Sequence, residues 1–154
     1  KYQLVIVGND EEKLIPNLRA LAKQEGVENQ VIILGAVFGA QKNDLIKGAK
    51  ILVLASFNEN FGNVILESLA CGRPVAVTDQ VGLAQEVEKA GCGIILPDTP
   101  KEMGLKILET LENESMLNFM GRNGLKLVQE KFSWHVIAQQ SIGLYQKYIK
   151  DLKI

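Results

Sequence analysis

Short runs of apolar residues alternate along the chain with longer stretches in which apolar residues recur at helical spacing. The runs are bounded by glycine, proline, asparagine or aspartate, which are typical of strand ends. They predict five strands, at residues 4–7, 31–34, 51–55, 74–78 and 93–96. The run at 51–55 is uniformly apolar, as expected of a strand covered on both faces.

Helical patterns separate these runs and then continue to the end of the chain. We expect helices at residues 11–25, 42–48, 63–71 and 83–89 between the strands, and at 101–111, 115–130 and 134–152 after them. Short strands alternating with helices indicate a parallel sheet with right-handed crossovers. The predicted fold class is therefore α/β: a Rossmann-like three-layer sandwich with a helical C-terminal tail, forming one domain over residues 1–154.

Parallel sheets bind ligands outside the carboxyl ends of their strands. Four loops qualify, at residues 8–10, 35–41, 56–62 and 79–82, and Asp79 in the last of them is a further candidate for ligand contact. The loop at 56–62 is dense in polar groups and opens a helix. Gly62 lies near the start of that helix, where free amides and the helix dipole favour an anion and where glycine lets a ligand approach the backbone.

Two glutamates flank this helix start. The side chain of Glu67 leans back toward the loop, with Asn63 on the same face, while the core stripe falls on residues 65, 66, 69 and 70. Glu59 and Glu67 can thus line one cleft, in which carboxylates accept hydrogen bonds from sugar hydroxyls and amides hold phosphate. The alternative is that both are ordinary surface charges, since glutamate is common on surfaces.

The segment from Ser56 to Ala76 closely resembles the E-x7-E signature of the group 1 (family 4) glycosyltransferases, which are retaining enzymes of the GT-B fold. That signature has a serine, then Glu-x-Phe-Gly, a second glutamate after four residues, and Gly-x-Pro-Val. The order of elements is similar to the C-terminal, donor-binding half of that family, from Leu4 to the helix that contains Trp134 and Tyr145.

The resemblance assigns roles to these residues. It implies that Glu67 binds the ribose hydroxyls of a nucleotide sugar and that Glu59, the catalytic candidate, faces the transferred sugar. It further implies that the backbone at Asn60, Phe61 and Gly62 holds the sugar hydroxyls and the distal phosphate. The other substrate-binding positions are Asn63, then Gly35, Ala36 and Val37 beside the nucleobase, and Gly82 beside the diphosphate or sugar.

Two departures from the family pattern matter. The family has paired glycines and a glutamate three residues later, whereas Gly82 is single and Glu86 follows four residues after it, so Glu86 is given no role. The family's Gly-Arg…Lys-Gly strand and loop, and its N-terminal acceptor domain, have no counterpart in this chain. We therefore expect the chain to be part of a larger enzyme, inactive alone, with an uncovered sheet edge that favours dimerisation.

The composition argues against several classes of partner and of binding site. Residues of the AVILMFWYC set make up 47% of the 154 residues, and 17 basic side chains oppose 18 acidic ones, giving a formal net charge of -1. No nucleic-acid partner is expected, and no run is long enough for a membrane helix. Two cysteines and one histidine predict neither a disulfide scaffold nor a zinc site. We expect a cytoplasmic protein whose parent is peripheral at the inner membrane face.

The expected function is binding of a nucleotide-diphosphate sugar as donor substrate, for transfer to an acceptor hydroxyl with retention at the anomeric carbon. No cofactor and no metal are expected, because an Asp-x-Asp motif is missing and the helix dipole can serve instead. Two alternatives are an epimerase of GT-B shape and a non-catalytic binding or scaffold module. The E-x7-E stretch speaks against the first, and the intact Glu59, Gly62 and Glu67 against the second.

Overall fold

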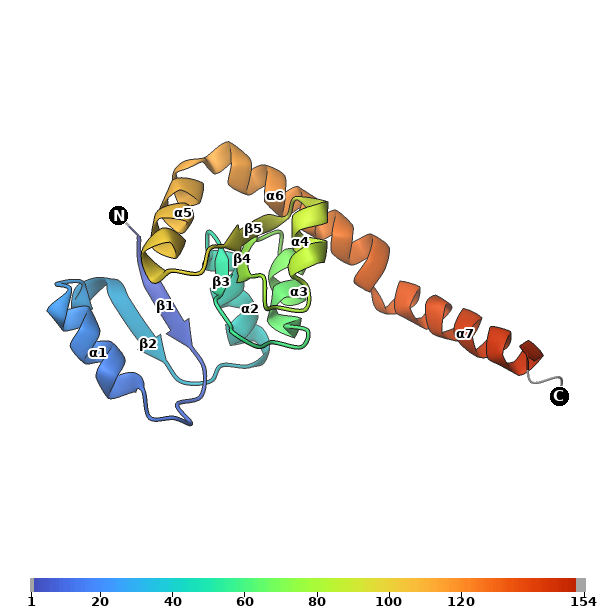
Figure 1. Ribbon diagram of the computed structural model, residues 1–154, viewed down its shortest axis with the longest axis horizontal. Helices are drawn as coiled ribbons and strands as arrows, with labels where there is room; N and C mark the ends of the chain where they lie inside the picture. Colours follow the sequence, from blue (N-terminus) through green and yellow to red (C-terminus); the bar gives the residue numbers. More distant parts are fainter. Residues whose placement is uncertain (1, 152–154) are drawn as a thin grey trace. The chain divides into compact units, whose positions relative to one another are not determined.

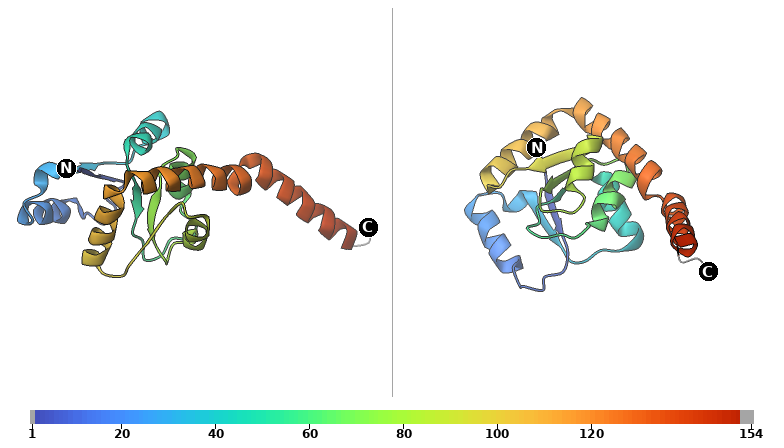
Figure 2. Two further views of the ribbon diagram at one scale, coloured as in Figure 1. Left: turned by 90° about the horizontal axis from the view of Figure 1, so that it is seen from above. Right: turned by 45° about the vertical axis from the view of Figure 1, so that its right-hand side comes forward.

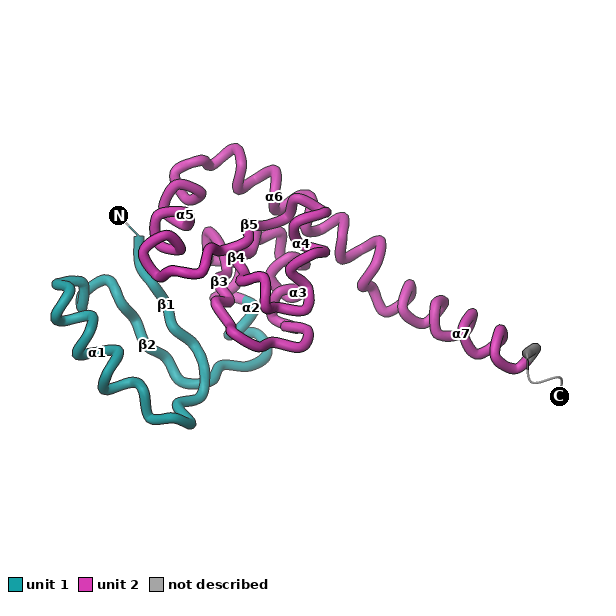
Figure 3. Tube along the Cα trace, in the orientation of Figure 1, with its two compact units in different colours: residues 1–43 teal, residues 44–154 magenta. Residues whose placement is uncertain are grey.

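A computed structural model describes the backbone of residues 2–151 and the side chains of residues 2–149. The chain divides into two compact units, coloured separately in Figure 3. The first unit extends to Asn43 and the second begins at Asp44. The boundary falls within helix α2 (Gly39–Gly48). Each unit is described by itself below.

The first unit contains β1 (Leu4–Val7), α1 (Ile15–Gln24), a 3-10 turn (Glu28–Gln30) and β2 (Val31–Leu34). The two strands are parallel. Helix α1 begins four residues later than its apolar spacing predicts. The reason is the carboxylate of Asp10. Its Oδ1 accepts hydrogen bonds from the amides of Leu14, at 2.6 Å, and Ile15, at 3.2 Å, and so caps the helix from a position before its first turn.

The second unit contains the other three strands and most of the helices (Figure 1). In chain order, after α2, they are β3 (Leu52–Leu54), α3 (Asn63–Ala70), β4 (Val75–Thr78), α4 (Ala84–Ala90), β5 (Gly93–Leu96), α5 (Pro100–Glu112), α6 (Glu114–Leu127), a π-helical segment (Val128–Phe132) and α7 (Trp134–Asp151). The strands are parallel in the order β3-β4-β5. The predicted helix at 115–130 is therefore α6 followed by a π-helical segment, and residue 152 of the last predicted helix lies outside the described residues.

The core of the second unit has two parts, one on each face of its sheet. On one face, Val75 and Val77 of β4 pack with α3, α4 and the end of α6. On the other, Ala76 and two residues of β5, Ile94 and Leu96, pack with α5 and Met120 of α6. The alternation along β4 sends successive side chains to opposite layers, so this unit has the helix–sheet–helix layering that the strand and helix order predicts.

The outer strands are less covered than their apolar sequences predict. Val53 of β3 is 41% exposed, and Leu4 and Val5 of β1 are 52% and 40% exposed. The described strands form a two-stranded and a three-stranded sheet, with β1 and β3 each at an edge. The run at 51–55 suggested a strand covered on both faces. Among the strands that the structure describes, only β4 has all of its residues buried.

The helical tail is confirmed. Helix α7 packs on the π-helical segment at its beginning and then leads away from the three-stranded sheet (Figure 2). The Oγ of Ser133 accepts a hydrogen bond from the amide of Val136 at 3.4 Å and caps the helix start. Among the residues that the structure describes, no helix combines the length and the hydrophobicity needed to cross a bilayer.

Candidate functional site

The loop at residues 56–62 lies at the carboxyl end of β3 and is fastened to the loop that follows β4. The amide of Gly82 donates to the carbonyl oxygen of Glu59 at 2.9 Å, and the hydroxyl of Thr78 donates to the carbonyl oxygen of Ser56. Glu59 and Val81 form an isolated parallel bridge. Two loops that are distant in sequence are thus held side by side at the carboxyl ends of the strands, where parallel α/β proteins bind ligands.

Gly82 is the point of closest approach between these loops. A Cβ at this position would lie 2.0 Å from the carbonyl oxygen of Asn60, so no other residue fits without moving the backbone. Its amide is used within the protein, by Glu59. In this structure Gly82 therefore positions the loop that carries Glu59, in addition to any ligand contact that the family resemblance implies for it.

Gly62 ends the loop and caps α3. Its φ is 78°, in the left-handed region, and a Cβ there would lie 2.9 Å from Cδ1 of Ile65. The carbonyl oxygen of Gly62 accepts the first helical hydrogen bond, from the amide of Ile65, at 2.8 Å. This backbone turns the chain sharply from the loop into α3, and only glycine adopts it at low cost.

The carboxylate of Glu59 folds back onto its own loop. Its Oε1 accepts hydrogen bonds from the amides of Phe61, at 3.2 Å, and Gly62, at 3.1 Å. These are two of the amides to which the family resemblance assigns a sugar or phosphate. A carboxylate oxygen thus lies where an anionic or hydroxyl oxygen of a ligand would lie, and a ligand that uses both amides must displace it.

Glu67 lies one turn into α3. The buried residues of this helix are Ile65, Ser68 and Leu69, whereas Ala70, which the sequence placed on the core stripe, is exposed. Glu67 and Glu59 are both half-buried and Asn63 is exposed. Glu59 is covered in part by its own loop, to which its carboxylate is hydrogen-bonded.

The nucleobase candidates follow β2 in the first unit. Gly35 and Ala36 are exposed and Val37 is half-buried. A Cβ on Gly35 would meet nothing within 4 Å, so space is available beside its backbone. The structure describes these residues within the first unit and the Glu59 loop within the second.

Other titratable groups nearby have structural partners. Lys131 forms an ion pair with Glu86 at 2.7 Å and lowers the pKa of that carboxyl, which agrees with a structural rather than a ligand-binding role. Burial raises the pKa of the Cys92 thiol to about 11. Among the described residues, no group of three or more histidine, cysteine, aspartate or glutamate side chains is gathered in a way that could hold a metal ion.

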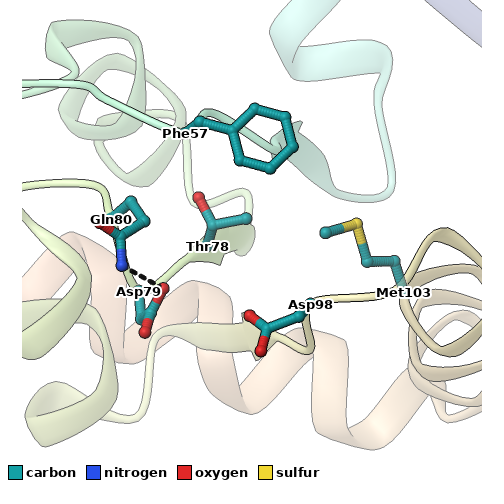
Figure 4. A pocket seen from close by; sticks show the side chains of 6 residues that line it. All are labelled: Phe57, Thr78, Asp79, Gln80, Asp98 and Met103. Carbon is teal, nitrogen blue, oxygen red and sulfur yellow. Dashed lines mark hydrogen bonds between the residues drawn. The ribbon is translucent and has the colours of Figure 1, made fainter.

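A pocket of about 350 Å³ lies at the same end of the sheet and was not predicted as a whole. Figure 4 shows its lining, which comes from the end of β4, from the segments that follow β3, β4 and β5, and from α5: Phe57, Thr78, Asp79, Gln80, Asp98 and Met103. Asp79 was a candidate from its position after a strand. Asp98 also follows a predicted strand, the fifth, so the rule that ligands bind after the carboxyl ends of strands points to it as well. No signal in the sequence singles out Phe57 or Met103.

Comparison with known proteins identifies the family of the chain. The family profile of "Glycosyl transferases group 1" matches residues 1–127. An uncharacterized glycosyltransferase of Methanocaldococcus jannaschii is 32% identical over 145 residues, which are 94% of this chain and 37% of that protein.

Solved structures are similar over nearly the whole chain. Sucrose-phosphate synthase of Thermosynechococcus elongatus aligns with a TM-score of 0.83 and 26% identity, covering 97% of this chain and 39% of that one. HepE of Anabaena, solved in complex with UDP and glucose, aligns with a TM-score of 0.81 and 25% identity, covering 94% and 40%. The chain thus spans well under half the length of these relatives. With its parallel α/β sheets, its E-x7-E segment at a strand end and a family match over most of its length, the chain belongs to the group 1 glycosyltransferases.

Proposed function

We propose that this chain is the donor-binding part of a retaining glycosyltransferase and holds a nucleotide-diphosphate sugar at the start of α3. The observation that carries the proposal is the arrangement around Gly62. A left-handed glycine opens the helix, two amides there already hold a carboxylate oxygen, and a second half-buried carboxylate follows one turn later. Amides suit phosphate or sugar oxygens, and carboxylates suit hydroxyl groups.

In the proposed reaction, the bond between the anomeric carbon and the diphosphate breaks, and the electron pair leaves with the nucleoside diphosphate. The acceptor oxygen forms the new bond to the anomeric carbon, and its proton passes to the leaving diphosphate. Glu67 accepts hydrogen bonds from the ribose hydroxyls, and Glu59 positions the transferred sugar. The relationship to HepE, which was solved with UDP and glucose, supports a donor of this chemical class.

Two partners are proposed, a further domain of the same polypeptide and a second copy of this chain. Because it spans 37% of the M. jannaschii relative, we propose that a further domain of the same polypeptide supplies groups that bind the acceptor and neutralise the diphosphate. The edge strands β1 and β3 are exposed. We also propose that the isolated chain associates through such an edge when that further domain is absent.

The test is calorimetric titration of the complete protein with UDP, GDP and ADP, chosen because the signature does not distinguish the bases. Replacing Glu67 with alanine removes a charged acceptor, which is worth roughly 1.5–3 kcal/mol, or about ten- to a hundredfold in affinity. Glu67→Gln should recover part of the loss, because an amide oxygen still accepts a hydrogen bond.

Glu59 supplies the internal control. Free nucleoside diphosphate lacks the transferred sugar, so Glu59→Ala should leave its affinity undiminished while kcat falls. Loss of nucleotide binding in Glu59→Ala but not in Glu67→Ala would reverse the two roles. If neither variant changes binding or rate, both glutamates are surface charges and the proposed site is wrong.

A further inference from the structure

The pocket lined by Phe57, Asp79, Gln80 and Asp98 plays no part in the donor binding proposed above, although it shares the loop at residues 56–62 with the donor site. Phe57 precedes Glu59 by two residues, which places their Cα atoms within about 7 Å of each other. The bond from the Thr78 hydroxyl to the Ser56 carbonyl and the bond from the Gly82 amide to the Glu59 carbonyl hold both loops in place. A ligand in this pocket would therefore lie beside the group proposed to hold the transferred sugar.

The charge of the pocket disfavours anionic ligands. Of its six described lining residues two are aspartates and none is basic. Both aspartates are exposed. A phosphate or carboxylate in this space would face like charges without a compensating cation, so a nucleotide diphosphate is disfavoured here.

The hydrogen-bonding capacity of the pocket is almost entirely that of an acceptor. Oδ1 of Asp79 accepts one hydrogen bond, from Nε2 of Gln80 at 3.1 Å. Asp98 has no hydrogen-bond partner within the part of the chain that the structure describes. An ionised carboxylate offers about four acceptor positions, so most of the capacity of both groups is directed at whatever enters the pocket. Such a site binds hydroxyl groups, which can donate.

The rest of the lining is apolar. Phe57 is 85% exposed, so its ring is open to a ligand, and Met103 also lines the pocket (Figure 4). Carboxylates together with an exposed aromatic ring match a sugar ring, which carries hydroxyls at its rim and C–H groups on its faces. A volume of about 350 Å³ is at the lower end of the range for small-molecule sites, which begins at about 300 Å³.

We propose that this pocket binds an uncharged sugar ring, through its hydroxyls to Asp79 and Asp98 and through one face to Phe57. On the proposed function, this ring is one part of the acceptor, whose remainder is bound by the further domain of the polypeptide, and it meets the donor sugar across the Glu59 loop. The pocket discriminates against phosphorylated sugars because its two carboxylates repel them.

The experiment is an NMR titration of the 154-residue chain with methyl α-glucoside, methyl α-mannoside and glucose 6-phosphate. Saturable shifts are expected for both glycosides at the backbone amides of Asp79 and Asp98 and at the side-chain amide of Gln80, with weaker binding of the phosphate. Asp98→Ala should weaken glycoside binding about tenfold, as loss of a charged acceptor does. Asp98→Asn should recover part of this.

Matched controls separate binding from general effects of mutation. Asp44→Ala removes an exposed aspartate outside the pocket, and Phe119→Ala removes a phenylalanine that is 55% exposed on α6. Both should bind the glycosides like the original chain, whereas Phe57→Ala should bind them more weakly. Neutralising both pocket carboxylates, with Asp79→Asn and Asp98→Asn together, should abolish the preference for glycosides over glucose 6-phosphate.

Three results would overturn the inference. The first is no saturable shift with either glycoside. Asp98 would then be a structural charge that interacts favourably with the dipole at the N-terminus of α5. The second is equal binding of glucose 6-phosphate. The third is shifts confined to residues 59–62 that disappear in Glu59→Ala, which would assign the sugar to the donor site. That third result would leave the proposed donor function intact, and nucleotide titration of Glu67 variants tests that function separately.

Discussion

The backbone of Gly62, at φ 78°, and its contact with Ile65 make this residue the most constrained point of the loop. Gly62→Ala adds a Cβ 2.9 Å from Ile65 Cδ1 in a left-handed conformation, so we expect a loss of about 1–3 kcal/mol in the free energy of unfolding. Urea denaturation followed by circular dichroism measures it.

The matched control is Gly104→Ala in the interior of α5. A Cβ on Gly104 meets nothing within 4 Å, and the helix favours alanine over glycine by roughly 0.5–1 kcal/mol, so this variant should be slightly more stable. If the two alanine variants lose equal stability, the left-handed turn at Gly62 is not the cause.

The two cysteines differ in environment. Cys92 is fully buried, and burial raises the pKa of its thiol to about 11, while Cys71 is half-buried. Because the thiolate is the reactive form, iodoacetamide at neutral pH should modify Cys71 and leave Cys92 largely untouched. Peptide mass spectrometry after a timed reaction checks this. Equal labelling of both cysteines would show that the region around Cys92 opens readily.

At the scale of one element, α5 begins with a reciprocal cap. Oγ1 of Thr99 accepts from the amide of Glu102 at 3.3 Å and donates to its carboxylate at 2.6 Å. Thr99→Ala should cost about 0.5–2 kcal/mol, whereas Thr99→Ser should cost much less because serine caps equally well. Thermal unfolding of the two variants provides the comparison, and similar losses in both would argue against a capping role.

The ion pair between Glu86 and Lys131 links α4 to the π-helical segment and gives a pH dependence of known sign. Lys131 lowers the pKa of Glu86 below its usual 4.5, through a hydrogen bond and through its charge. The folded state thus favours the carboxylate, so this contribution to stability is present above pH 4.5 and is lost as the pH falls through the lowered value.

The variant Glu86→Gln should therefore be less stable than the original chain at neutral pH, with the difference shrinking in acid and in added salt. Urea denaturation at several pH values measures it. Glu88→Gln, at an exposed position of the same helix without an ion pair in the described residues, is the control. A difference that is independent of pH would contradict the role of the pair.

Element positions were predictable from the sequence because apolar runs bounded by glycine and proline mark strands clearly. The strand at 93–96 matches β5 residue for residue. The start of α1 was not predictable in this way, because hydrogen bonds to the Asp10 side chain determine where the helix begins. The signature pointed to Glu59, but its hydrogen bonds to the amides of Phe61 and Gly62 depend on the loop conformation. The pocket escaped prediction because three separate segments and α5 meet there.

At the scale of the whole molecule, the exposed apolar strand β1 predicts self-association. Leu4, Val5 and Val7 are 52%, 40% and 42% exposed, and an open strand edge pairs readily with another chain. We expect the mass measured by light scattering to rise with concentration. Val5→Lys should suppress the rise, while Phe119→Lys, on an exposed face of α6, should not. A constant monomer mass at millimolar concentration would contradict the prediction.

The loop at residues 56–62 owes its shape to hydrogen bonds with Thr78 and Gly82 and to packing of Gly62 against Leu54 and Ile65, all within the second unit. Its conformation is therefore inherited together with one contiguous stretch of gene. Recombination that joins this stretch to a different neighbouring domain would keep the loop intact. A chimeric protein that takes residues 54–82 from this chain should therefore keep the conformation of this loop.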